Sequence, residues 1–147
     1  MSRTANLRRQ HDAAIDLVAQ IAESSKAPES RDRAYRIAVL LAKLTGMLRI
    51  HFVQEDKTLY PYMTASTNVT AVTKAHEFQD EMGGLGAAFE AFAKRWSTSA
   101  AIARDFDQFR RESEHIFGAL GERIKRENEE LYPLADAIQP GEVPRTA

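Results

Sequence analysis

Cysteine is absent from the 147 residues of this sequence. Disulfides, thiolate metal sites and cysteine nucleophiles are therefore excluded, and any bound metal must take nitrogen and oxygen ligands. An excess of charge of one sign is also missing, since 20 lysines and arginines face 21 aspartates and glutamates and the formal net charge is -1. This balance creates no field that attracts nucleic acid or an anionic membrane, so we expect neither as a partner.

Long apolar runs are absent as well. No uninterrupted apolar stretch approaches the roughly 18 residues that span a bilayer. The N-terminal segment MSRTANLRRQHD is not followed by the apolar region of a signal peptide. We therefore expect a cytoplasmic protein. The length fits one domain, and a hydrophobic content of 44% with 28% charged residues is ordinary for a soluble globular protein.

Glycine and proline are few, and most of them lie outside the segments rich in helix formers. Helices are predicted over about residues 4–24, 30–63, 69–95 and 100–137. Apolar residues recur along them in steps of three and four. Amphipathic helices with short connections pack best as an up-down-up-down four-helix bundle, so we expect an all-α bundle over residues 1–138. Residues 139–147 are expected to form a loose tail.

Polar residues interrupt the apolar stripes of these helices. They are His11, His51, Glu55, His76, Asp80, Arg123 and Glu127. In an up-down-up-down bundle all seven lie at the same end, because they alternate between helix starts and helix ends. Burying a polar group without a partner costs several kcal/mol, so each must be paired, hydrogen-bonded or coordinated.

A histidine and a carboxylate four residues later share one helix face, so both can contact one ion or two bridged ions. His51 with Glu55, and His76 with Asp80, form such pairs. Histidines and carboxylates from several helices are how bundles build carboxylate-bridged di-metal sites. The predicted metal ligands are His11, His51, Glu55, His76, Asp80 and Glu127. A structural polar network is the alternative for the set, and a rim salt bridge is the alternative for Asp80.

One histidine and two tyrosines are predicted to lie outside such a site. His115 is one step off its stripe and is expected at the surface. Tyr60 and Tyr132 are expected to be packing and rim residues. Each precedes a proline in a Leu-Tyr-Pro segment, and Pro61 and Pro133 are predicted to end their helices, because proline disfavours the helical conformation of the residue before it.

The segments RRQHD, HFVQEDKTLYP, AHEFQDEM and RIKRENEELYP, in this order, resemble the hemerythrin-like family with the HHE cation-binding signature, from about Leu7 to Leu134. The resemblance implies a four-helix bundle with a non-haem di-iron centre. It also implies a role in oxygen binding, in oxygen or redox sensing, or in handling iron, nitric oxide or peroxide. By position it assigns ligand roles to His11, His51, Glu55, His76 and Glu127, with both glutamates as bridges. Asp80 stands where the family's oxygen carriers have a second histidine.

Arg123 departs from the family pattern, which has a histidine at this position. Arginine stays protonated and offers only donors, so it cannot ligate a cation. Either Arg123 pairs with Asp80 or Glu127 and leaves a smaller ligand set for an asymmetric di-metal or a single-metal centre, or it turns outward. For a bound cation we favour two iron ions over one. Zinc or another divalent metal is the alternative cofactor.

The leading functional hypothesis is a binding protein whose iron centre binds or senses oxygen or a related small molecule such as nitric oxide or peroxide. One alternative is a peroxide- or nitric-oxide-processing di-iron enzyme, although no separate acid, base or substrate pocket is evident. The other is a metal-free or zinc-bound helical module for protein association. The sequence indicates no particular protein partner.

Overall fold

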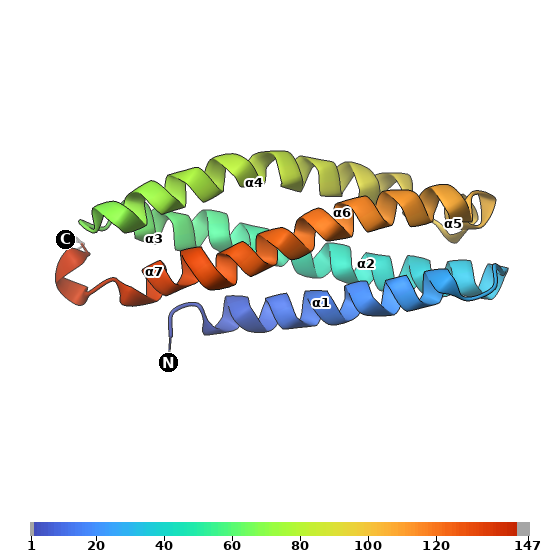
Figure 1. Cartoon of the computed structure of the whole chain (residues 1–147), viewed down its shortest axis with the longest axis horizontal. Helices are drawn as coiled ribbons and strands as arrows, with labels where there is room; N and C mark the ends of the chain where they lie inside the picture. The colour runs from blue at the N-terminus through green and yellow to red at the C-terminus, as the bar shows by residue number, and fades with distance from the viewer. Residues whose placement is uncertain (1, 144–147) are drawn as a thin grey trace.

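Long amphipathic helices make up most of the chain. The computed structural model describes residues 2–143, and this part is all-helical, with no strand. Its long helices are α1 (Ala5–Lys26), α2 (Arg31–Gln54), α4 (Val69–Arg95) and α6 (Phe106–Arg126). They lie side by side along the long axis of the molecule (Figure 1). The prediction of an all-α fold is confirmed.

Side-chain caps set several helix starts, because they satisfy backbone N–H groups that have no partner inside the helix. Ser30, which precedes α2, accepts a hydrogen bond from the backbone N–H of Arg33. Asp105 accepts one from Gln108, and it divides the last predicted helix by separating α5 (Ser99–Arg104) from α6. The prediction of one unbroken helix over residues 100–137 was therefore wrong.

The two Leu-Tyr-Pro segments are not helix ends, contrary to the prediction. The helical segments after α2 and α6 are the π-helical turn η1 (Glu55–Leu59), α3 (Tyr60–Thr64), the π-helical turn η2 (Glu127–Leu131) and α7 (Tyr132–Ala137). Pro61 and Pro133 each fall in the first turn after a π-helical turn. The first turn of a helix tolerates proline, because the missing N–H is not required there.

The hydrophobic core has two parts. The larger apolar cluster includes Leu48 and Phe109, and it is formed mainly by α1, α2, α4 and α6. The smaller cluster includes Leu7, Leu59 and Leu131, and it gathers the start of α1 with α3, the first part of α4 and α7. These last segments lie at one end of the molecule, and α5 lies at the other (Figure 1). Along α2 and α6, buried polar residues separate the two clusters.

Residues 139–143 pack against the rest of the protein instead of forming the expected loose tail. They contain a 3-10 turn, η3 (Pro140–Glu142), whose Glu142 carbonyl accepts a hydrogen bond of 2.7 Å from the backbone N–H of Thr67. Val143 packs partly against the smaller apolar cluster. The remaining residues of the predicted tail, 144–147, lie outside the described residues.

Within residues 2–143, one helical stretch, Arg31–Thr64, is long and apolar enough by length and composition to cross a membrane. Its most apolar window has a mean hydropathy of 1.4. Arg36, Lys43 and Arg49 interrupt the apolar residues of this stretch, so it is not the uninterrupted apolar run that the sequence was expected to lack. The inward face of the stretch is apolar except for Thr45, His51 and Glu55, and Tyr35, Ile50 and Val53 add exposed apolar surface. Because core helices of soluble proteins pass the same test, this stretch is weak evidence for a membrane span.

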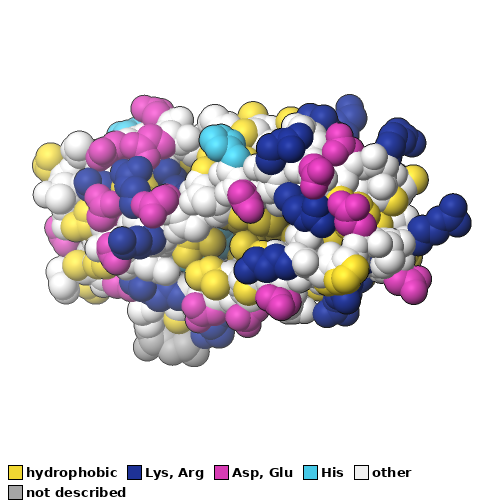
Figure 2. All heavy atoms as spheres, turned by 45° about the vertical axis from the view of Figure 1, so that its right-hand side comes forward, with side chains coloured by type: hydrophobic (Ala, Val, Ile, Leu, Met, Phe, Trp, Pro, Cys, Tyr) yellow, Lys and Arg dark blue, Asp and Glu magenta, His cyan; other side chains and the backbone are white. Residues whose placement is uncertain are grey.

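The charged residues mix on the surface. Figure 2 shows lysine and arginine side chains interspersed with aspartate and glutamate side chains over the visible face. This mixture agrees with the formal net charge of -1.

Candidate metal centre

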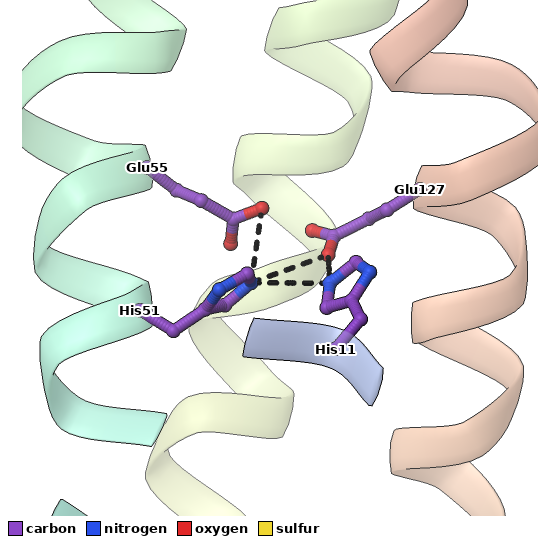
Figure 3. Close-up of side chains that lie close together, drawn as sticks. All are labelled: His11, His51, Glu55 and Glu127. Carbon is purple, nitrogen blue, oxygen red and sulfur yellow. Dashed lines mark hydrogen bonds and ion pairs between the residues drawn. The ribbon is translucent and has the colours of Figure 1, made fainter. Parts of the chain in front are cut away.

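Four buried side chains converge between the two apolar clusters. His11 comes from α1, His51 from α2, Glu55 from the start of η1 and Glu127 from the start of η2. Each is at most 2% exposed. Figure 3 shows that their polar ends point toward one another. One ligand atom from each side chain lies within 4.8 Å of the corresponding atoms of the other three.

The shortest distances within this cluster are close to those between neighbouring ligands of one ion. His11 Nε2 lies 2.8 Å from Glu127 Oε1 and 3.1 Å from His51 Nε2, and His51 Nε2 lies 3.5 Å from Glu55 Oε2. With metal–ligand bonds of about 2.1 Å, neighbouring ligand atoms are about 3.0 to 3.4 Å apart. Small movements of these side chains would therefore be enough to place all four donors around one ion.

The hydroxyl of Tyr132 lies inside the same cluster. It donates to Glu55 Oε2 at 2.8 Å and lies 3.2 Å from His11 Nε2. Tyr132 is fully buried, so the expectation of a packing or rim residue missed its hydroxyl. Burial, together with the charges of Glu55 and Glu127, raises the pKa of this phenol above its ordinary value. The group therefore stays protonated and donates a hydrogen bond in the metal-free protein.

Two amides orient the histidines. The Nδ1 of His51 lies 2.7 Å from Gln10 Oε1, and the Nδ1 of His11 lies 2.9 Å from Asn128 Oδ1. Because an amide oxygen accepts, each Nδ1 carries the proton, and the Nε2 is the atom directed at the cluster. Metal-binding histidines characteristically donate their second N–H in this way. Neither amide was predicted from the sequence, although Gln10 precedes His11 and Asn128 follows Glu127.

Arg123 turns inward, the first of the two outcomes considered for it. Its Nε donates to Glu127 Oε2 at 3.2 Å, and its Nη2 donates to the Tyr60 hydroxyl at 2.9 Å and to the carbonyl of Phe78 at 2.7 Å. The side chain is only 6% exposed, and its guanidinium lies 4.5 Å from the centre of the Phe78 ring. Arg123 is therefore a buried counter-charge for Glu127.

The structure does not bring His76 and Asp80 into the cluster. Both are exposed, so the prediction that their stripe of α4 faces inward was wrong. The buried face of this half of α4 consists of Ala71, Ala75, Phe78 and Met82. Of the six predicted ligands, His11, His51, Glu55 and Glu127 come together, and their binding of a metal stays a prediction. His115 is exposed, as expected.

The charges of the cluster are strongly coupled. Burial by itself lowers the pKa of His51, but Glu127 and Glu55 outweigh it and raise the pKa to about 9. Burial and the charge of Glu127 raise the pKa of Glu55 to about 7. Burial opposes ionisation of Glu127 as well, yet hydrogen bonds with His11 and His51 hold its pKa below the usual range. Without a cation, protons therefore supply positive charge to this cluster.

Glu55 shows how well the residues fit an ion. Its Oε1 is, within residues 2–143, the one buried side-chain nitrogen or oxygen without a hydrogen-bond partner. Such an atom costs about 1 to 3 kcal/mol unless something contacts it. Coordination to a cation would remove this cost. Two imidazoles and two carboxylates suit iron, zinc and similar divalent metals.

These pKa shifts predict that the metal-free protein loses stability as the pH rises. His51 has a raised pKa, so its contribution is complete below its ordinary value of 6.5 and is lost as the pH rises through about 9. Glu55 acts in the same direction, with a contribution complete below 4.5 and lost through about 7. We expect the melting temperature of chelator-treated protein to fall between about pH 6 and pH 9. A melting temperature that rises over this range would contradict the arrangement, and metal-loaded protein, in which the ion replaces the protons, is the control.

Fold and site together define an all-helical protein with a buried histidine and carboxylate cluster compatible with a metal site. Residues 2–135 match the family model described as the hemerythrin HHE cation binding domain. The chain therefore belongs to the hemerythrin HHE family, which confirms the resemblance seen in its motifs. Comparison with curated proteins and with solved structures found no match.

Proposed function

We propose that this protein binds iron through His11, His51, Glu55 and Glu127 and uses it to bind or sense oxygen or a related small molecule. The observation that carries the proposal is the convergence of four buried nitrogen and oxygen donors in a chain of the HHE cation-binding family. Bound iron would supply a reversible change of oxidation state and a coordination position for a small ligand.

The side chains around the cluster suit this role. The amides of Gln10 and Asn128 hold the two imidazoles with Nε2 directed inward, and the Tyr132 hydroxyl holds Glu55. Apolar clusters lie on both sides and exclude water. The expected up-down-up-down bundle belongs to the proposal, and the side-by-side packing of the long helices supports it (Figure 1).

A pocket of about 270 Å³ lies between α1 and η1, and none of the four cluster residues lines it. Its lining includes Leu7, Gln54 and Leu59. Gln54 accepts a hydrogen bond of 2.8 Å from Gln10, which in turn contacts His51. The amide pair therefore links the pocket to the histidine. We propose this side, between α1 and η1, as the route by which a small ligand approaches.

Metal analysis of the purified protein tests the proposal. We expect iron by elemental analysis and a visible absorption that changes on reduction. His51→Ala should remove both, because it deletes one of the two imidazoles. His76→Ala is the matched control and should keep both, because His76 is exposed and outside the cluster. Wild-type protein that neither contains iron nor takes it up from ferrous solution would count against the proposal.

A further inference from the structure

The segments His51–Pro61 and Arg123–Pro133 repeat one pattern in sequence and in structure. Each begins with a buried side chain that is followed four residues later by a buried glutamate. A π-helical turn begins at each glutamate, and a buried tyrosine follows each turn. The two segments therefore contribute equivalent positions to the centre, with His51 in one copy and Arg123 in the other.

The two tyrosines cross over between the copies. The hydroxyl of Tyr132 lies 3.4 Å from His51 Nε2, and the hydroxyl of Tyr60 accepts a hydrogen bond of 2.9 Å from Arg123 Nη2. Each tyrosine thus reaches the first residue of the opposite copy. The guanidinium of Arg123 and the imidazole of His51 consequently occupy equivalent positions in the two halves of the centre.

Glu127 joins the two halves. Its Oε1 lies 2.8 Å from His11 Nε2, and its Oε2 accepts from Arg123 Nε at 3.2 Å. One oxygen therefore faces the donors that can surround an ion, and the other faces a permanent positive charge. A carboxylate that bridges two cations divides its oxygens in the same manner.

The second half offers no ligand set of its own. Arg123 has only donors and remains charged. From α4, the guanidinium contacts the ring and the carbonyl of Phe78, and Glu81 Oε2 lies 3.5 Å from Nη1. Glu81 is exposed and also pairs with Arg126, and His76 and Asp80 are exposed, so this half contributes no buried ligand from α4. The residues therefore fit one ion beside His11 and His51, and they do not fit the pair of ions that the family resemblance implies.

We propose that the guanidinium of Arg123 takes the place of a second cation, so that the centre holds one metal ion per chain. The inference rests on the proposed function only in requiring that the site binds a metal. Arg123 supplies the positive charge that Glu127 would otherwise receive from a second ion.

The stoichiometry of wild-type protein tests this directly. Chelator-treated protein is loaded with excess Mn(II), and ions per chain are counted by native mass spectrometry and elemental analysis. We expect one ion per chain and the electron paramagnetic resonance spectrum of an isolated Mn(II). Two ions with a spin-coupled spectrum would overturn the inference and leave the proposed function standing. Absence of binding, repeated with ferrous iron, would overturn both.

Substitution of the arginine tests its role as a charge. Arg123→Met keeps an unbranched side chain but removes the positive charge beside Glu127, so the affinity for Mn(II), measured by competition with a chelator, should rise by about tenfold or more. Arg126→Met is the control, since Arg126 also lies over Phe78, at 4.7 Å, but pairs with Glu81 and Glu130 instead. The affinity of the Arg126→Met variant for Mn(II) should equal that of the wild-type protein. Unchanged or weakened binding of Mn(II) by Arg123→Met would contradict the inference. If this variant does not fold, the number of ions bound per chain by the wild-type protein still tests the inference.

Discussion

Glu127→Gln is expected to lower the free energy of unfolding of the metal-free protein by about 3 to 5 kcal/mol. The substitution keeps the shape of the side chain but removes the charge that Arg123 and His11 contact at 3.2 and 2.8 Å. Arg123 is 6% exposed, so its guanidinium cannot recover the lost interaction from water. The other carboxylate near it, Glu81, is 3.5 Å away and largely solvated. Urea denaturation at neutral pH, with chelator present, measures the change.

Glu130→Gln is the matched control. Glu130 is also on η2 and pairs with Arg126 and Lys74, but its side chain is 41% exposed. Surface ion pairs contribute about 1 kcal/mol or less, so little stability should be lost. A loss at Glu127 no larger than the loss at Glu130 would show that Arg123 does not depend on Glu127 for its counter-charge.

His11→Ala is expected to abolish the stabilisation that a bound metal gives to the fold. An ion that binds only the native state at about 100 times its dissociation constant adds about 2.7 kcal/mol. His11 supplies one of the two imidazoles, so without it the remaining donors should not be saturated at the same metal concentration. Thermal unfolding with and without metal measures the difference. His115→Ala, at an exposed histidine, should leave it unchanged.

Asn128→Leu is expected to reduce the stabilisation by bound metal less than His11→Ala does. It keeps both imidazoles and removes the side-chain amide whose oxygen lies 2.9 Å from His11 Nδ1. Loss of such an orienting group lowers metal affinity by about 10- to 100-fold, so stabilisation should return at higher metal concentration. Equal behaviour of the alanine and leucine variants would contradict the separate roles of ligand and orienting residue.

The helical periodicity of the sequence was sufficient to predict four of the converging residues. Spacings of three and four residues place His51 and Glu55 on one helix face. The same spacings along the last helix place Glu127 on its inward face. The proline signals misled, because the sequence does not show that a π-helical turn precedes Pro61 and Pro133. The turn begins a new helical segment whose first turn accommodates proline.

Helix α4 shows why His76 and Asp80 are not among the converging residues. It carries two adjacent stripes, and one rotation about its axis buries Phe78 and Met82 while the other buries His76 and Asp80. Burying a large apolar side chain gains about 1.5 to 3 kcal/mol, whereas an unpaired buried carboxylate costs far more. Packing of the whole helix against its neighbours therefore decided how α4 is rotated about its axis. The spacing of one stripe in the sequence does not show which of the two stripes is buried.

The sequence by itself determined the chemistry available to this protein: nitrogen and oxygen donors without thiolates, a repeated glutamate motif, and an arginine that cannot ligate a cation. Only the tertiary structure decided which of these groups meet. The contacts of Arg123 with Tyr60 and Phe78, and the contact of the Tyr132 hydroxyl with Glu55, join atoms on different helices. Spacing within one helix fixes the face on which a residue lies, but the distance between two helices and their rotations are set by the packing of the entire core.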